Sequence, residues 1–251
     1  MRPQLANWAA WSSIVEGNVL SDLALRKEGE EADRLFNDSI DKYTKAVEIK
    51  PDMHEAWNNW GTALSDLARL KDGEEADRLF NGSFDTYAKA VEIKPDMHEA
   101  WNNWGTALSD LALLKDGEEA DRLFNDSFDM YAKAVEIKPD MHEAWYNWGI
   151  SLAHMARRKE GEEADRLLEQ AREKMSAAEQ LSSGYAVYNL ARVAALQGDP
   201  EEAKEWLLKT REHGKLPTLK HIQEDSDLDS LRDEPWFKEL IEELEAGKSS
   251  S

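Results

Sequence analysis

The feature that most constrains this chain is a repeat of 44 residues. Segment 51–94 matches segment 95–138 at 41 of 44 positions. The differences are Arg69 against Leu113, Gly82 against Asp126, and Thr86 against Met130. The pattern continues, with more substitutions, into 7–50 and 139–182. Such a repeat is typical of solenoids, in which internal units pack against both neighbours and terminal units diverge as caps.

Each unit contains two stretches with the apolar spacing of an α-helix. In 51–94 the apolar residues recur at steps of three and four, which predicts a first helix over residues 54–70. A second stripe follows the turn at 71–73 and predicts one continuous helix that runs through Gly82. Pro95 ends this helix, because proline lacks the amide hydrogen and disfavours helical dihedrals in the residue before it.

The first helix carries the motif Glu-Ala-Trp-Asn-Asn-Trp-Gly, and the second ends with Tyr-Ala-Lys-Ala-Val-Glu-Ile-Lys-Pro. With small residues at Gly61, Ala76 and Ala90, these units resemble tetratricopeptide (TPR) repeats, lengthened by about ten residues from the usual 34 or so. The resemblance implies an all-α, right-handed solenoid forming a single domain. We expect long units at 7–50, 51–94, 95–138 and 139–182, an ordinary unit at 183–216, and a C-terminal cap helix and tail at 217–251.

Charge and composition exclude several classes of function. The net charge of −21 would repel the phosphate backbone, so nucleic acid is not an expected partner. The chain has no cysteine, which excludes disulfides and thiolate chemistry. Residues 1–8 lack the layout of a signal peptide, and no run approaches the roughly 20 apolar residues of a membrane span. We therefore expect a cytoplasmic protein without a membrane partner.

No residue pattern predicts catalysis, a metal or a cofactor. The chain has no glycine-rich phosphate loop and no nucleophile elbow, so we expect a protein that is not an enzyme. A His-Glu pair begins each first helix, but the second ligand position of a zinc motif holds other residues. The histidines are His54, His98 and His142, followed four residues on by Asn58, Asn102 and Tyr146.

The aspartates Asp225, Asp227 and Asp229 match only the start of a calcium-binding loop. Ser230 replaces the required glycine, and Trp236 stands where the loop needs a bidentate glutamate. We interpret this stretch as a capping loop. The tryptophan pairs of the first helices, such as Trp57 with Trp60, lie on the apolar stripe and are predicted to pack in the core.

The TPR resemblance implies that the polar stripe of the first helices lines a concave surface that holds extended peptides. The residues of this predicted groove are Glu55, Asn58, Asn59, Thr62, Asp66, Glu99, Asn102, Asn103, Thr106, Asp110, Glu143, Tyr146, Asn147, His154 and Asn189. The asparagines either bind a peptide backbone, as in some relatives, or are only tolerated exposed residues. Relatives that clamp chaperone C-terminal carboxylates use lysine and arginine here, so the acidic row predicts a neutral or basic protein or peptide instead.

The sequence therefore predicts a protein–protein interaction scaffold, and two alternatives stay open. Nearly identical units present similar end surfaces, so the chain could self-associate as a dimer or by end-to-end stacking. Trp8 and Trp11, which are out of phase with the repeat, could form such a contact. The near identity of two units also fits an engineered or recently duplicated array without an evolved ligand.

Overall fold

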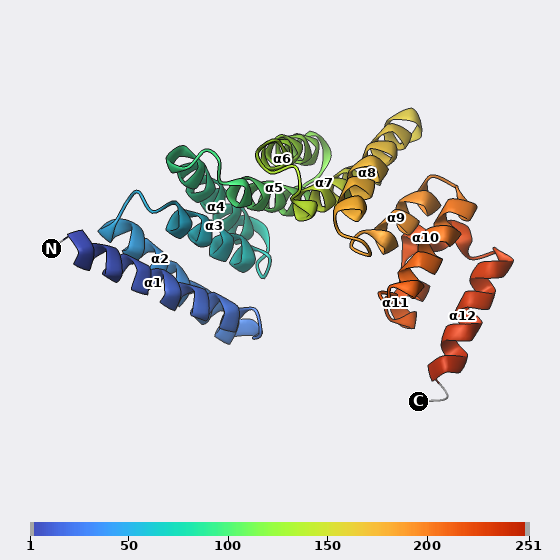
Figure 1. The fold of residues 1–251 in the computed structure, drawn as a ribbon, viewed down its shortest axis with the longest axis horizontal. Helices are drawn as coiled ribbons and strands as arrows, with labels where there is room; N and C mark the ends of the chain where they lie inside the picture. Colours follow the sequence, from blue (N-terminus) through green and yellow to red (C-terminus); the bar gives the residue numbers. More distant parts are fainter. Residues whose placement is uncertain (1–2, 249–251) are drawn as a thin grey trace. The chain divides into compact units, whose positions relative to one another are not determined.

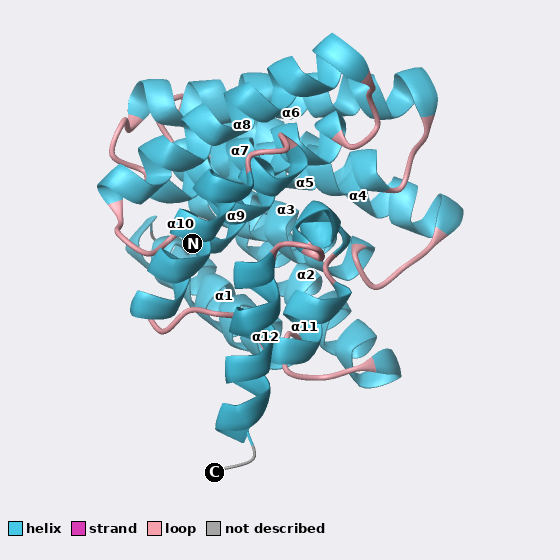
Figure 2. Ribbon diagram, turned by 90° about the vertical axis from the view of Figure 1, so that its right-hand side faces the viewer, coloured by secondary structure: helices cyan, strands magenta, loops and turns pink. Residues whose placement is uncertain are grey.

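The structure, a computed structural model, describes residues 3–248, and this part of the chain contains helices and loops but no strand (Figures 1 and 2). Consecutive helices form antiparallel pairs. The pairs are α1 (Pro3–Ala24) with α2 (Gly29–Ile49), α3 (His54–Ala68) with α4 (Gly73–Ile93), α5 (His98–Leu113) with α6 (Gly117–Ile137), α7 (His142–Ala156) with α8 (Gly161–Leu181), and α9 (Val187–Leu196) with α10 (Pro200–Glu212). The predicted all-α class is confirmed.

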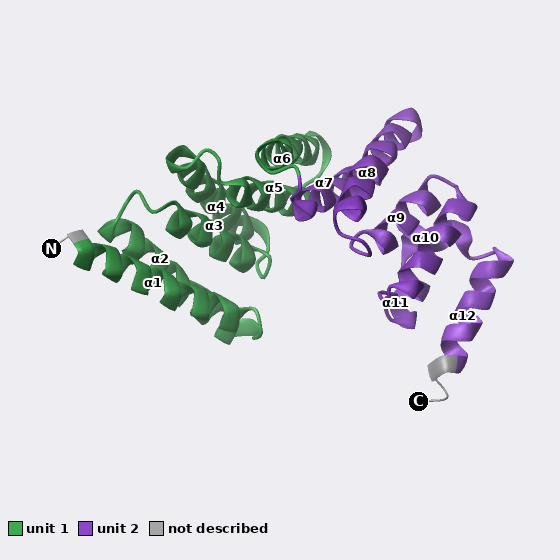
Figure 3. Ribbon diagram, viewed as in Figure 1, with its two compact units in different colours: residues 1–139 green, residues 140–251 purple. Residues whose placement is uncertain are grey.

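The chain divides into two compact units, residues 1–139 and 140–251 (Figure 3). Unit 1 contains α1 to α6, and each second helix packs against the first helix of the next pair: α2 on α3, and α4 on α5. Unit 2 contains α7 to α10, followed by α11 (Leu219–Glu224), the 3-10 helix η1 (Ser226–Leu231) and α12 (Pro235–Lys248).

The helix ends follow from local sequence. Gly73 has a φ of +57°, a left-handed conformation that glycine adopts without strain, and it begins α4 directly after a short turn. Glu74 and Glu75 then place negative charge at the positive end of the helix dipole. The predicted continuity of this helix through Gly82 is confirmed, whereas α3 ends at Ala68, two residues before the predicted end.

A tyrosine of each second helix packs against a glycine of its partner helix. Tyr87 is 1% exposed, and a Cβ added to Gly61 would lie 2.8 Å from its ring. Tyr43 and Tyr131 make the same approach to Gly17 and Gly105. Because a larger residue would collide with the ring, these glycines allow the two helices of a pair to come close together.

The tryptophan pairs of the first helices stack, but they lie half-buried beside the core rather than within it as predicted. Trp57 and Trp60 stack with ring centroids 5.4 Å apart, and the Trp57 indole donates a hydrogen bond to the Pro51 carbonyl at 2.8 Å. Trp57, Trp101 and Trp104 pack against a buried cluster that joins the end of α4 to the start of α5. These side chains therefore stabilise the stacking of one pair on the next.

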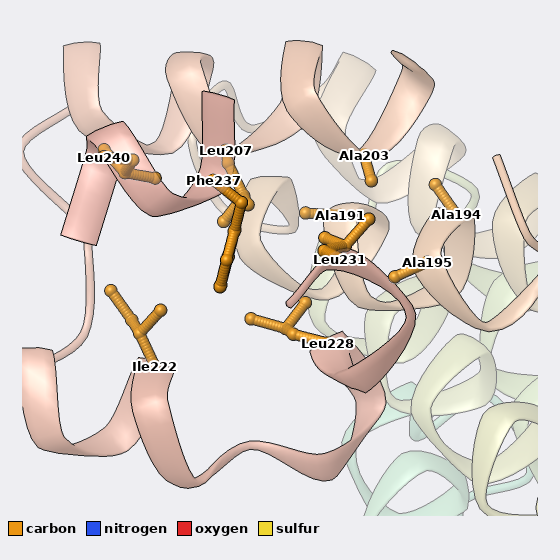
Figure 4. Packing of buried hydrophobic residues seen from close by; sticks show 10 residues of the cluster. All are labelled: Ala191, Ala194, Ala195, Ala203, Leu207, Ile222, Leu228, Leu231, Phe237 and Leu240. Atoms are coloured by element: carbon orange, nitrogen blue, oxygen red, sulfur yellow. The ribbon is translucent and has the colours of Figure 1, made fainter. Parts of the chain in front are cut away.

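The C-terminal segment forms a cap on unit 2. Phe237 and Leu240 of α12 share a buried cluster with Leu207 of α10 and with Leu228 and Leu231 of η1 (Figure 4). The helix α12 lies within the segment 217–251 for which a cap helix and tail were expected, and it ends at Lys248. Residues 249–251 of the predicted tail lie outside the described part of the chain.

Two glycine substitutions in unit 1 test the close helix approach. Gly61→Ala places a methyl group against Tyr87, so we expect it to lower the free energy of unfolding by about 1–3 kcal/mol. Gly82→Ala is the matched control, because its Cβ would lie 3.5 Å from Leu64, an ordinary contact. We expect the control to raise stability by about 0.5–1 kcal/mol in denaturant unfolding. Equal effects of the two substitutions would contradict the packing described above.

Candidate functional site

Side-chain amides from three first helices form one hydrogen-bonded ladder in unit 1. Asn59 of α3 donates to Oδ1 of Asn18 in α1 at 3.0 Å, and Asn58 donates to Oδ1 of Asn59 at 3.1 Å. Asn103 of α5 donates to Oδ1 of Asn58 at 3.2 Å, and Asn102 donates to Oδ1 of Asn103 at 3.3 Å. The structure thus brings the predicted asparagines of α3 and α5 together and adds Asn18 to them.

The members of this amide ladder differ in exposure. Asn58 and Asn102 are each 7% exposed, whereas Asn59 and Asn103 are half-buried. An amide side chain has two N–H donors and an oxygen with two lone pairs. Asn59 and Asn103 each use one N–H donor and one oxygen lone pair in the ladder. Each therefore has one N–H and one lone pair that the ladder does not use.

A surface pocket lies where α1 meets α3, next to the ladder. Its floor includes Tyr43, whose hydroxyl donates to Oδ1 of Asn18 at 2.8 Å. The residues that line this α1–α3 pocket are Asn18, Ser21, Asp22, Leu25, Tyr43, Asn59, Thr62 and Asp66. It therefore combines amide and hydroxyl groups with two carboxylates.

The predicted threonines are held by the buried tyrosines. Thr62 donates to the Asn58 carbonyl at 3.2 Å and accepts a hydrogen bond from the Tyr87 hydroxyl at 3.2 Å. Thr106 makes the equivalent bonds, to the Asn102 carbonyl at 3.1 Å and from Tyr131 at 3.3 Å. Burial raises the pKa of Tyr87 to about 12, so its hydroxyl stays protonated and keeps its donor.

Arg69 joins the two aspartates of the predicted groove. Its Nε donates to Oδ2 of Asp110 at 2.7 Å, and the same guanidinium pairs with Asp66. Burial raises the pKa of both aspartates, and the charge of Arg69 opposes that rise. The negative charge expected from Asp66 and Asp110 in the groove is therefore partly neutralised by Arg69.

The glutamates of the predicted groove lie at the start of their helices. Glu55 contacts His54 at 3.2 Å and Glu99 contacts His98 at 3.1 Å. In unit 2, Glu143 makes the same contact with His142 at 3.3 Å. Among the described residues no group of three His, Cys, Asp or Glu side chains could hold a metal ion.

The remaining predicted residues of unit 2 form a network of internal contacts. Asn189 donates to the Tyr146 hydroxyl at 2.7 Å, and Arg192 donates to Oδ1 of Asn189 at 2.7 Å. His154 lies 3.0 Å from Arg157. Asn147, the other predicted residue of this unit, lies half-buried on α7.

The C-terminal segment covers this polar surface of unit 2. Asp227, which is 5% exposed, pairs with Arg157 and with Arg192, the latter at 2.8 Å. Asp225 pairs with Arg192 at 3.1 Å and accepts a hydrogen bond from the Tyr188 hydroxyl at 2.8 Å. The aspartates considered for calcium thus bind arginines, and the first-helix surface of unit 2 is occupied by the chain itself.

The sequence reasoning did not identify the arginines that organise both surfaces. Arg69 could have been found, because it is one of three differences between two nearly identical units and follows Asp66 by three residues, a spacing that favours an ion pair. No such pattern indicated the ion pairs of unit 2, because about 35 to 70 residues separate the partners. These pairs join Arg157 and Arg192 to Asp225 and Asp227.

Comparison with known proteins identifies the fold. The profile of a family described as "Plant specific mitochondrial import receptor subunit TOM20" matches residues 7–102. Among solved structures, the type IV pilus biogenesis factor PilW aligns with a TM-score of 0.61 and 17% identity, covering 94% of this chain and 93% of PilW. No curated protein matches the chain.

Two further solved structures are TPR proteins. YrrB, described as having an unusual peptide-binding site, aligns with a TM-score of 0.51 and 19% identity over 80% of this chain and 84% of its own. A thermophilic TPR protein of Thermus thermophilus, TTC0263, aligns with a TM-score of 0.55 and 14% identity over 84% and 94%. The chain therefore has a TPR-like helical repeat fold, as its motifs predicted.

The expected cytoplasmic location is wrong. The match of residues 7–102 is to a family of mitochondrial import receptor subunits, which the composition of the chain gave no means of recognising. Within residues 3–248, no helix has the length and apolar character needed to cross a membrane.

Replacement of Arg69 tests the charge balance of the site. Arg69→Leu gives this position the residue that the next unit has, and it leaves Asp66 and Asp110 without their shared cation. The pKa of both carboxyls should then rise further in the folded state, so the folded state binds more protons than the unfolded one above about pH 4. We expect the variant, relative to the parent, to lose stability as pH rises from about 4 to 7 in denaturant titrations. Arg78→Leu, at an exposed site on α4, is the control, and parallel pH profiles of all three proteins would contradict the assignment.

His154 provides a second pH test, in unit 2. Burial, together with Arg157 and Arg192, lowers the pKa of His154 to about 4. Between about pH 6.5 and 4 the unfolded chain therefore binds a proton that the folded one does not, and stability should fall as pH drops through this window. We expect His154→Gln to reduce this loss, measured by thermal unfolding at each pH. The same pH dependence in parent and variant would show that His154 does not contribute.

Proposed function

We propose that unit 1 binds arginine-rich, amphipathic segments of other proteins, as a receptor in mitochondrial protein import. The observation that carries this proposal is that the α1–α3 pocket, and every residue of the amide ladder except Asn103, lie within residues 7–102, the stretch that matches the import receptor subunit family. Mitochondrial targeting peptides are amphipathic, rich in arginine and poor in acidic residues. They therefore belong to the neutral or basic class of partner that the acidic row of groove residues predicted.

The charges on the first helices of unit 1 support a basic ligand. Asp22 and Asp66 line the α1–α3 pocket, and Glu55 and Glu99 lie at the starts of α3 and α5. Arg69 is the cation that pairs with this surface, and it is shared between two aspartates. The surface therefore keeps a negative excess, which favours association with cationic segments and slows association with anionic ones.

The amides would provide contacts that do not depend on side-chain sequence. The spare N–H and lone pair of Asn59 and Asn103 match the carbonyl and amide groups of a peptide backbone. A receptor for many different targeting segments needs this kind of contact, because backbone groups are common to all of them. Charge would then select basic segments, and the amides would hold them in place.

We propose that the repeats at 7–50, 51–94 and 95–138 act together as the binding array. Each contributes one first helix to it: α1, α3 and α5. In unit 2 the equivalent surface pairs with Asp225 and Asp227, so a basic ligand would meet arginines there rather than free carboxylates. The proposed site is therefore confined to unit 1.

Binding of a defined peptide tests this function. The probe is a fluorescein-labelled peptide of about 20 residues that forms an amphipathic helix with arginine on its polar face and no acidic residue. We expect measurable binding by fluorescence anisotropy, weakened as ionic strength rises because exposed charges are screened by salt. A peptide with glutamine in place of every arginine should bind at least tenfold more weakly.

Matched variants locate the site. We expect Asp22→Asn combined with Glu55→Gln to weaken binding about two- to fivefold per charge removed. Asp85→Asn combined with Glu92→Gln removes the same charge from exposed positions of α4 and should leave affinity unchanged. Equal weakening by both double variants would show that net charge alone attracts the peptide and would overturn the proposed site.

A further inference from the structure

One face of α1 exposes a continuous stripe of apolar side chains. Its members recur at steps of three and four, so they lie along one side of the helix. They are Leu5 (58% exposed), Trp8 (76%), Trp11 (41%), Val15 (58%), Val19 (53%) and Leu23 (42%). Scattered exposed apolar residues are normal on protein surfaces, but a continuous patch of this kind marks an interaction site.

The stripe is also almost free of charge. Among its 22 residues α1 carries two charged side chains, Glu16 and Asp22, and no lysine or arginine. Glu16 is paired with Lys42 of α2 at 2.5 Å. In a chain with 33% charged residues, this helix is therefore unusually neutral, and its occupant must present an apolar surface rather than a basic one.

The repeat shows that the C-terminal part of this face is covered elsewhere in unit 1, whereas Trp11 and Val15 correspond to the half-buried Glu55 and Asn59. Val19 and Leu23 correspond, 44 residues on, to Ala63 and Leu67 of α3, which are 1% and 2% exposed. The helix α3 packs against α2, and α5 packs in the same way against α4. Among the described residues no helix precedes α1, so Val19 and Leu23 lack the cover that Ala63 and Leu67 have.

The opposite end of the repeat array is closed. The helix α12 covers α10 through Phe237 and Leu240, which are 2% and 5% exposed (Figure 4). Head-to-tail stacking into filaments needs two open ends on each molecule. The described helices leave such a face open on α1, and the same face of two copies can pair about a twofold axis.

We propose that the exposed face of α1 is a homodimer interface, in which the α1 helices of two copies pack antiparallel about a twofold axis near Val15. In this register Trp11 of one copy lies opposite Val19 of the other, and Trp8 lies opposite Leu23. The bulky N-terminal half of the stripe thus meets the smaller C-terminal half, which a parallel arrangement would not achieve. In this arrangement the dipoles of the two helices also point in opposite directions.

The charges near α1 favour a second copy over a lipid surface. Helices that lie in a membrane interface carry lysine and arginine beside their apolar face, because membranes have anionic headgroups. α1 has neither residue. The hollow next to Val15 and Val19 is bordered by Asp38 and Asp41 of α2, and by Lys42, which is paired with Glu16. These carboxylates would be repelled by an anionic surface.

The oligomeric state of the full chain tests the proposal. We expect light scattering behind a sizing column to give twice the mass of one chain at concentrations of tens of micromolar, with dissociation on dilution. Val15→Arg places two like charges at the twofold axis, so it should weaken the dimer at least tenfold. Val15 is 58% exposed, so the fold should tolerate the change, which unaltered thermal unfolding at low concentration would verify.

Leu113→Arg is the matched control. It introduces the same side chain at another exposed apolar position, and the preceding repeat already carries an arginine there, at Arg69. We expect this variant to dimerise like the parent. A loss of dimer in both variants would mean that added charge, rather than the α1 contact, disrupts association, and it would overturn the proposal.

Cysteine cross-linking tests the register, because the chain has no cysteine of its own. Val15→Cys should form a disulfide-linked dimer under mild oxidation, since the two residues meet at the axis. Trp8→Cys should not, because its counterpart lies at the far end of the partner helix. A parent protein that is monomeric at about 100 µM would overturn the proposal. Flotation of the parent protein with vesicles of phosphatidylcholine and anionic lipid would also overturn the proposal if Val15→Arg abolished it. That result would identify a lipid surface as the occupant of this face.

Discussion

The close approach of the two helices in each pair is the constraint on which the rest of the structure depends. A tyrosine such as Tyr87 occupies the space that a glycine such as Gly61 leaves, and its hydroxyl donates a hydrogen bond to Thr62, the next residue of the first helix. The same residue thus sets the helix spacing and fixes a polar group of the first-helix surface. Because the arrangement repeats every 44 residues, the polar groups of successive first helices come into register and the amide ladder can form.

Charge then distinguishes the first-helix surfaces of the two units. In unit 1 a single arginine is shared by two aspartates, so the surface stays acidic and its pocket keeps carboxylates. In unit 2 the balance is reversed, since Arg157 and Arg192 bind the aspartates of the C-terminal segment. A paired, buried carboxylate is costly to expose, so this segment should stay in place when a basic ligand approaches. The repeated scaffold therefore presents one open polar surface and one that is internally satisfied.

Much of this fold could be predicted from the sequence, because it depends on local spacing. The 44-residue period, the apolar stripes and Pro95 placed the helices, and the TPR-like motif identified the fold. The candidate site was harder to predict from the sequence than the fold. The row of groove residues could be read from the repeat, but not that Asn58 and Asn102 would be buried within a ladder, because that depends on contacts between repeats. The exposed stripe of α1 and the arginine–aspartate network of unit 2 likewise depend on which surfaces meet in three dimensions.

In the function proposed here, the first-helix surface of unit 1 receives a basic segment. The most direct measurement is the side-chain amide signals of asparagine in the ¹⁵N NMR spectrum during titration with an arginine-rich amphipathic peptide. We expect the signals of Asn18, Asn59 and Asn103 to move as the peptide binds, while that of Asn189, half-buried in unit 2, does not. Saturable binding that shifts Asn189 and leaves Asn59 and Asn103 unmoved would contradict it.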